Sequence, residues 1–245
     1  MSGARYAVFF VPPADSALYR FGAAALGYDA YSGGEVPSLA DDHVGAAEWH
    51  ALTAEPRRYG FHATLKPPFH LRAEYAEDDL VAEFAVFARH RNAPPEFAAS
   101  IRTLGSFTAL VPSAPAPAVN ALADDCVRGF DRFREPPTEA ERDRRLAHKL
   151  TSRQIDHLDR WGYPYVFEDF RFHMTLSGRL PAARTDSVLA LLRDAHERAE
   201  VPATIAIEAI TLLRQDRADA RFRVIHQASL SVAHSPIAAS RHDFI

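Results

Sequence analysis

Two short segments of the chain carry the same reactive residues at the same spacing. Residues 59–66 read YGFHATLK and residues 170–177 read FRFHMTLS, so each contains a histidine followed two positions later by a threonine. The surrounding frame also repeats, with an aromatic residue, a phenylalanine and a leucine at matching positions. One His-x-Thr tripeptide arises easily in a chain with 12 histidines, but a pair in matching frames indicates two related halves.

Both segments have the alternation of a β-strand, in which every second side chain shares a face. The apolar residues would then point into a core, and His62, Thr64 and Lys66 would share the opposite face. In the second segment His173 and Thr175 would do the same. Residues two apart on a strand are separated by roughly 6.6 Å, so an imidazole and a hydroxyl can converge on one phosphate-sized group.

Two such strands facing each other predict acid-base chemistry at phosphorus. In-line displacement needs one group to take a proton from the attacking oxygen and another to give one to the leaving oxygen. Histidine suits both roles because its ordinary pKa is about 6.5. Thr64 and Thr175 could donate hydrogen bonds to the non-bridging oxygens, and this scheme requires no metal. The sequence does not indicate whether His62 or His173 is the base.

With these motifs in place, the chain resembles the 2H phosphoesterase superfamily, and within it a branch of uncharacterised proteins encoded beside phosphonate-degradation genes. Residues 56–66, 126–134 (CVRGFDRFR), 161–165 (WGYPY) and 170–176 carry the resemblance. It implies a bilobal fold with a central cleft and metal-independent chemistry on cyclic phosphates or 2′-5′ linkages. It also implies His62 and His173 as the catalytic pair, with Thr64 and Thr175 holding the phosphate.

Three further residues are candidates for substrate binding, each with a plainer alternative. Lys66 could offer a cation to a second phosphate or to the transition state, or could be a solvated lysine at a strand end. Arg171 could clamp a phosphate, or pair with Glu168 or Asp169. Tyr163 precedes the second motif in a proline-containing turn, where its ring could stack on a base or sugar or simply pack.

The sequence offers little support for a metal or cofactor. Asp41, Asp42, His43, Glu48 and His50 are potential ligands, but their spacing fits no common metal motif. The single cysteine excludes a cysteine-rich zinc site and an intramolecular disulfide. We therefore expect neither a metal site nor a cofactor.

Composition limits the partners and the location. Hydrophobic residues make up 47% of the chain and charged residues 24%, as in ordinary globular proteins, and the net charge is −4. This charge favours a small phosphorylated substrate over a long nucleic acid, whose affinity usually comes from many cationic contacts. The apolar run from Tyr6 to Val11 is too short for a signal-peptide core or a membrane span. We expect a cytoplasmic protein without a membrane anchor; its oligomeric state is left open.

The order of elements predicts how the motifs are positioned. Strands are expected at residues 5–11, at 58–66 ending before Pro67, and from about 166 or 170 to 180. A capping-box pattern at Thr138 predicts a charged helix toward Arg160. Strands and helices mix without regular alternation or a glycine-rich turn after the first strand, which favours α+β over a doubly wound nucleotide-binding fold. We expect one bilobal domain over residues 1–245, with two antiparallel sheets and flanking helices related by pseudo-twofold symmetry around a central cleft.

Three functions fit this pattern. The first is a phosphodiesterase that opens a small cyclic phosphate, with a ribose or sugar phosphate in phosphonate metabolism as the substrate that the resemblance implies. The second is an RNA-end enzyme acting on 2′,3′-cyclic phosphates or 2′-5′ bonds, like the 2′-5′ RNA ligases. The third is a nucleotide or sugar-phosphate binding protein without turnover.

Overall fold

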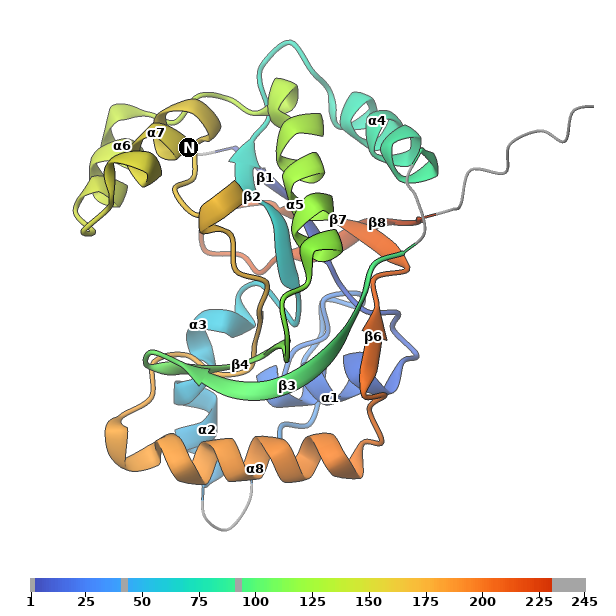
Figure 1. The fold of residues 1–245 in the computed structure, drawn as a ribbon, viewed down its shortest axis with the longest axis vertical. Coiled ribbons are helices and arrows are strands. Elements are labelled where there is room, and N and C mark those ends of the chain that lie inside the picture. The colour runs from blue at the N-terminus through green and yellow to red at the C-terminus, as the bar shows by residue number, and fades with distance from the viewer. Residues whose placement is uncertain (1–2, 41–43, 91–93, 231–245) are drawn as a thin grey trace, which may run out of the picture.

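A curved antiparallel sheet forms the centre of the structure and takes strands from both halves of the chain (Figure 1). The computed structural model describes residues 3–40, 44–90 and 94–230. In these residues the order across the sheet is β6-β3-β4-β5-β2-β1-β7-β8. The strands are β1 (Arg5–Phe10), β2 (Ala63–His70), β3 (Glu96–Leu104), β4 (Phe107–Pro112), β5 (Met174–Thr175), β6 (Thr204–Ala206), β7 (Ala209–Gln215) and β8 (Arg223–Ser229).

The strand order shows the expected pseudo-twofold symmetry. The strand of the first motif, β2, and that of the second, β5, are central neighbours, and three strands extend outward from each. The registers also correspond, since Phe9 faces Thr64 across β1 and β2 while Ala109 faces Thr175 across β4 and β5. The α+β class and the antiparallel pairing are confirmed. The two expected sheets join into one, because β5 pairs with both β2 and β4.

The motif strands differ from the predicted ranges at their ends. β2 does not stop before Pro67 but continues to His70. Only Ala63 of β2 pairs with β5, so beyond that point one edge of β2 is unpaired and prolines, which cannot donate to a ladder, are tolerated there. In the second motif only Met174 and Thr175 form a strand, and the remaining residues of the predicted range are irregular or turn structure.

Helices cover the sheet and extend beyond it. They are α1 (Ala17–Leu26), α2 (Ala46–Leu52), α3 (Ala54–Arg57), α4 (Glu77–Arg89), α5 (Pro117–Gly129), α6 (Glu139–Leu146), α7 (Ser152–Trp161) and α8 (Thr185–Arg198). α4 packs on β7 and β8, α5 on β2, and α8 on β3 and α1. α5 and α8 bury apolar stripes against the sheet.

The predicted charged helix is two helices. The capping box at Thr138 forms as expected, with its hydroxyl accepting from the Glu141 amide. The helix nevertheless ends at Leu146, and a second capping box at Thr151 begins α7. Neither element buries a broad apolar face, since only Leu158 of the two is buried. This helical pair projects from the sheet and lies beside the N-terminal end of β1 in Figure 1.

One hydrophobic core cluster joins the two halves, with Phe9, Phe10, Phe61, Leu110 and Met174 all 0–1% exposed. These residues hold β1, β2, β4 and β5 together around the motifs. The assignment of residues 1–245 to one domain stays a prediction, because residues 231–245 lie outside the described part. Within that part, every helix is too short or too polar to cross a membrane.

Candidate active site

The pairing of β2 with β5 sets the geometry of the two motifs. Ala63 and Met174 are directly opposite each other and fully buried. In an antiparallel ladder the adjacent positions then also face each other, and their side chains lie on the other side of the sheet. Both histidines and both threonines occupy these adjacent positions. The sequence repeat therefore becomes a spatial cluster around the Ala63–Met174 pair.

The register makes this cluster a crossed arrangement, which we call the quartet: His62 opposite Thr175, and Thr64 opposite His173. Directly opposite residues have Cβ atoms about 4.5–5.5 Å apart and diagonal ones about 7–8 Å. The two imidazoles are thus on one diagonal and the two hydroxyls on the other. All four side chains are partly exposed and line one pocket of about 500 Å³, the histidine pocket.

Both imidazole rings are anchored in the same way. His62 Nδ1 lies 2.8 Å from the carbonyl oxygen of Gly60, and His173 Nδ1 lies 2.7 Å from that of Arg171. A carbonyl can only accept, so Nδ1 carries the hydrogen in both rings. Each Nε2 is therefore the ring nitrogen that is free to accept a proton. His62 Nε2 is 3.3 Å from the Thr64 hydroxyl.

The aromatic environments of the two rings differ. The Phe9 ring stacks on His62 with centroids 3.9 Å apart and planes 22° apart, and Tyr59 lies 5.9 Å away on the same imidazole. His173 has only the tilted ring of Phe107, at 5.9 Å, among the ring contacts of the described residues. Burial lowers the pKa of His62 from 6.5 to about 4, and the nearby His173 acts in the same direction. At neutral pH His62 is neutral and can accept a proton.

The hydroxyls of the second motif have separate roles. The described residues provide no hydrogen-bond partner for Thr175 Oγ1, which leaves it available to a ligand. Ser177, at the position matching Lys66, is fully buried, accepts from the Thr108 amide at 2.9 Å and donates to the Gly178 carbonyl. Ser177 therefore fixes the end of the second motif to β4.

Lys66 does not share the face of the quartet, which corrects the sequence prediction. Phe9 faces Thr64 but Val8 faces Lys66, so Leu65 is an extra residue in β2, a β-bulge that shifts the alternation by one. Lys66 is 1% exposed and its Nζ donates to the Val127 carbonyl at 3.0 Å.

The same amino group forms an ion pair with Asp131 at 3.2 Å. Burial lowers the pKa of Lys66 to about 8, which Asp131 partly opposes. Since Val127 lies in α5 and Asp131 follows that helix, Lys66 ties α5 to the sheet. Its position is structural.

Arg171 and Tyr163 lie at the margins of the site. The exposed Arg171 lines a smaller pocket of about 190 Å³ that adjoins the quartet at Thr64 and His173. Asp169, one of its possible partners, pairs instead with Arg153 at 2.7 Å. Tyr163 lines both this small pocket and the histidine pocket, as a wall between them, and burial raises the pKa of its hydroxyl.

Sequence reasoning missed several residues that line the histidine pocket. These include Phe9, Tyr59, Arg5, Arg145 and Arg179. Arg179 follows the second motif directly, a position that could have marked it. Arg145 ends a charged run that reads as a solvated helix face, and Phe9 and Arg5 come from the first strand, whose place beside β2 only the fold shows.

The residues considered as metal ligands show other contacts. Asp41, Asp42 and His43 lie outside the described residues. Glu48 pairs with Arg184 at 2.6 Å, and the ring of His50 contacts Arg57. Across residues 3–40, 44–90 and 94–230, no three histidine, cysteine or carboxylate side chains gather as a metal site would require.

Comparisons with solved structures give weak likenesses over nearly the whole chain. One is titled a phosphoesterase (TM-score 0.40, 15% identity, 94% of this chain and 99% of that one). Another is E. coli LigT in complex with NADP⁺ (TM-score 0.43, 14% identity, 94% and 99%).

Curated relatives are closer in sequence. A protein of Janthinobacterium sp. (strain Marseille) named "Ribose 1,5-bisphosphate phosphokinase PhnN" is 37% identical over 89% of this chain and 49% of its own length. A protein of the same name from Laribacter hongkongensis (strain HLHK9) is 33% identical over 94% of this chain and 53% of its own length. The chain thus spans about half the length of these relatives. The family described as "Protein of unknown function (DUF1045)" matches residues 64–223, and the chain belongs to that family.

Proposed function

We propose that the protein is a phosphodiesterase that opens a small cyclic phosphate by acid-base catalysis between His62 and His173, without a metal. The observation that carries this proposal is the crossed register of the quartet. A phosphorus atom held between the two diagonals would have an imidazole on either side and a hydroxyl on either side. Attack and departure on opposite sides of phosphorus require this disposition of proton acceptor and proton donor.

The proton movements follow from the environments of the rings. Neutral His62 accepts a proton at Nε2 from the attacking water, whose oxygen forms the new bond to phosphorus. Protonated His173 gives its Nε2 proton to the ring oxygen as the old P–O bond breaks. Thr64 and Thr175 donate hydrogen bonds to the non-bridging oxygens as negative charge develops. His62 takes the role of base because the stacked Phe9 ring favours its neutral form.

A small sugar phosphate is the substrate class that fits best. A pocket of about 500 Å³ is in the range of small-molecule sites, and the net charge of −4 disfavours extended nucleic-acid contacts. The name of the two curated relatives includes ribose 1,5-bisphosphate. That name supports a phosphorylated ribose, in phosphonate metabolism, as the compound whose cyclic phosphate is opened.

The test is a screen of cyclic phosphates followed by phosphorus NMR, which reports ring opening and its regiochemistry together. We expect turnover of a ribose cyclic phosphate that survives a strong chelator and depends only mildly on salt. The doubly substituted protein His62→Ala, His173→Ala, prepared identically, controls for contaminating enzymes. Loss of activity with chelator and rescue by one metal would contradict the mechanism. A steep fall with salt, together with preference for RNA ends, would assign the protein to the RNA-end class instead.

A further inference from the structure

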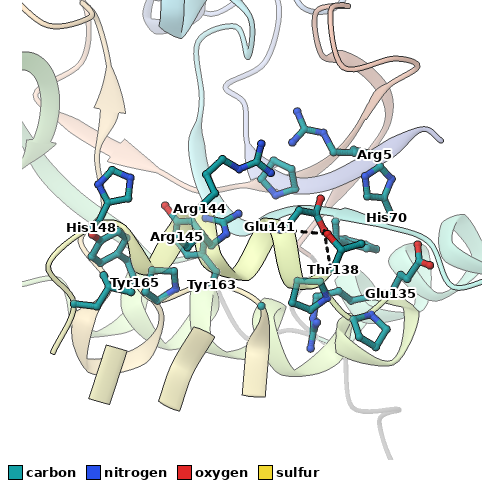
Figure 2. Close-up of a pocket in the computed structure, with 18 of the residues that line it drawn as sticks. Arg5, His70, Glu135, Thr138, Glu141, Arg144, Arg145, His148, Tyr163 and Tyr165 are labelled. Atoms are coloured by element: carbon teal, nitrogen blue, oxygen red, sulfur yellow. Dashed lines mark hydrogen bonds between the residues drawn. The ribbon is translucent and has the colours of Figure 1, made fainter. Parts of the chain in front are cut away.

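A second, larger pocket opens beside the quartet. It has a volume of about 1030 Å³ and lies between the first residues of β1, the far end of β2 and the α6–α7 pair (Figure 2). The residues that line both this pocket and the histidine pocket are Arg5, Glu55, Tyr59, Pro68, Arg145 and Tyr163. The two spaces are therefore neighbouring parts of one cleft, and a substrate bound at the quartet could extend past these side chains into the larger part.

The larger pocket, which we call the arginine chamber, is rich in cationic side chains. Glu141 is engaged by the backbone and side chain of Thr138 in the capping box, as Figure 2 shows. Arg134 is engaged by Asp131 at 2.8 Å. The charged and titratable residues on its walls are Arg5, Arg134, Arg144, Arg145, His70, His148, Glu55, Glu135 and Glu141.

Two of these arginines are oriented by neutral partners. Arg5 donates from Nε at 2.8 Å, and from Nη2 as well, to the side-chain oxygen of Gln215. The guanidinium of Arg145 lies over the Tyr163 ring, 5.0 Å from its centroid. Both side chains are half-buried, and no carboxylate of the described residues forms an ion pair with either. An amide and an aromatic ring fix their position without neutralising their charge, as a site for an anion requires.

We propose that Arg5 and Arg145 bind a second anionic group of the substrate, a phosphate monoester on the same small molecule whose cyclic phosphate reacts at the quartet. This inference rests on the proposed function. It narrows the substrate class to a sugar that carries two separate phosphate groups. The two arginines come from opposite walls, β1 and α6, at the junction between the histidine pocket and the arginine chamber.

The test compares a matched pair of substrates, a nucleoside 2′,3′-cyclic phosphate with and without a 5′-phosphate. For the wild-type protein we expect a higher kcat/KM with the 5′-phosphate. Arg5→Gln and Arg145→Gln should each lower kcat/KM for the 5′-phosphorylated compound by roughly 10- to 100-fold, because each removes a charge-assisted hydrogen bond. The compound without the 5′-phosphate should be little affected. Arg142→Gln, which changes a partly exposed arginine of the same helix that lies outside the pocket and pairs with Asp159, should change neither value.

Two results would overturn this proposal. Equal loss for both substrates would mean that the arginines serve the reacting phosphate, and no loss for either would mean that they bind no phosphate. If the wild-type protein turns over no cyclic phosphate of the screen, the proposed function fails, and calorimetric binding of ribose 5-phosphate still tests the second site. Weaker binding to Arg5→Gln and Arg145→Gln than to Arg142→Gln would support it, and unchanged binding would overturn it.

Discussion

His62 and His173 occupy matching positions in the two motifs, but the residue beside each motif on the neighbouring strand differs. Phe9 of β1 faces Thr64 of β2, and its ring covers His62. The residue that faces Thr175 of β5 is Ala109 of β4, which has no ring to cover His173. The repeated backbone thus places both imidazoles alike, while Phe9 and Tyr59 cover His62 more closely than Phe107 covers His173.

Under the proposed function, this difference would let a symmetric frame support an asymmetric reaction. An acid-base pair needs one neutral and one protonated imidazole at the same pH, and two identical surroundings would give both rings the same protonation equilibrium. Burial under Phe9 favours the neutral form of His62. Specialisation of the two halves therefore needs no change in the motifs themselves.

Removing either imidazole is expected to have the largest effect on turnover. We expect His62→Ala and His173→Ala each to lower kcat by roughly 10²- to 10⁴-fold, as for loss of a general base or acid. The measurement is steady-state turnover of the best cyclic phosphate from the screen. His90→Ala, which changes an exposed histidine at the end of α4, is the matched control. Wild-type activity in either motif variant would remove that residue from the mechanism.

Replacing the ring that covers His62 tests whether burial sets the protonation of that imidazole. Phe9→Ala should raise the pKa of His62 from about 4 toward 6.5 by admitting water, so the acidic limb of the kcat/KM profile moves to higher pH. The limbs belong to the coupled pair, so their movement on substitution is the informative quantity.

A stability measurement separates this effect from damage to the fold. Phe9→Ala is expected to cost about 3–5 kcal/mol because Phe9 is fully buried; Phe9→Leu keeps most of the apolar volume and should cost less than about 1.5 kcal/mol. Between pH 6.5 and 4 the unfolded wild-type chain binds a proton at His62 that the folded chain does not, so this group's stabilisation falls as the pH falls. In Phe9→Ala that loss should be smaller. An unchanged pH dependence would contradict burial by Phe9 as the cause.

Thr64→Val and Thr175→Val compare the two hydroxyls. Each should lower kcat/KM by about 1.5–3 kcal/mol in transition-state free energy if it donates to a charged oxygen. The Thr64 variant should lose more, because its hydroxyl also contacts His62 Nε2. Denaturant unfolding serves as the control, since both side chains are partly exposed and little change in stability is expected. Unaltered kinetics would reassign the hydroxyls to structure.

The smallest catalytic effects are expected at Lys66 and Ser177, which occupy matching positions at the ends of the motifs. Ser177→Ala should cost about 1–3 kcal/mol of stability by leaving the Thr108 amide without its partner. Lys66→Met should change the free energy of unfolding and remove the part of its pH dependence that Lys66 contributes above about pH 8. The kcat per folded molecule should stay near that of wild type. A large fall in kcat for Lys66→Met at full occupancy of the folded state would place that amine in the reaction.

The sequence was sufficient for the features that depend on local pattern. Alternation along 59–66 and 170–177 predicted which residues share a face, and the mixed order of elements predicted the α+β class. It failed at Lys66 because a bulge at Leu65 depends on the pairing with β1, not on the residues of β2. It also missed Phe9 and Arg145, whose importance comes from neighbours distant in the chain. The spacing of apolar residues along the sequence predicts which side chains share a face of a strand or helix. Which of these faces lie against each other depends on the strand order and on how the helices pack.

The two-residue strand β5 has a further consequence for how the molecule responds to its ligand. Within the described residues, β5 is the strand that links β6, β3 and β4 on one side to β2, β1, β7 and β8 on the other, so the quartet spans the most sparsely bonded seam in the ladder. A phosphate that accepts hydrogen bonds from Thr64 on one strand and Thr175 on the other would add cross-links at that seam. Occupancy would then stiffen the sheet at its thinnest point, and hydrogen exchange at the amides of β5 would slow in proportion to ligand concentration.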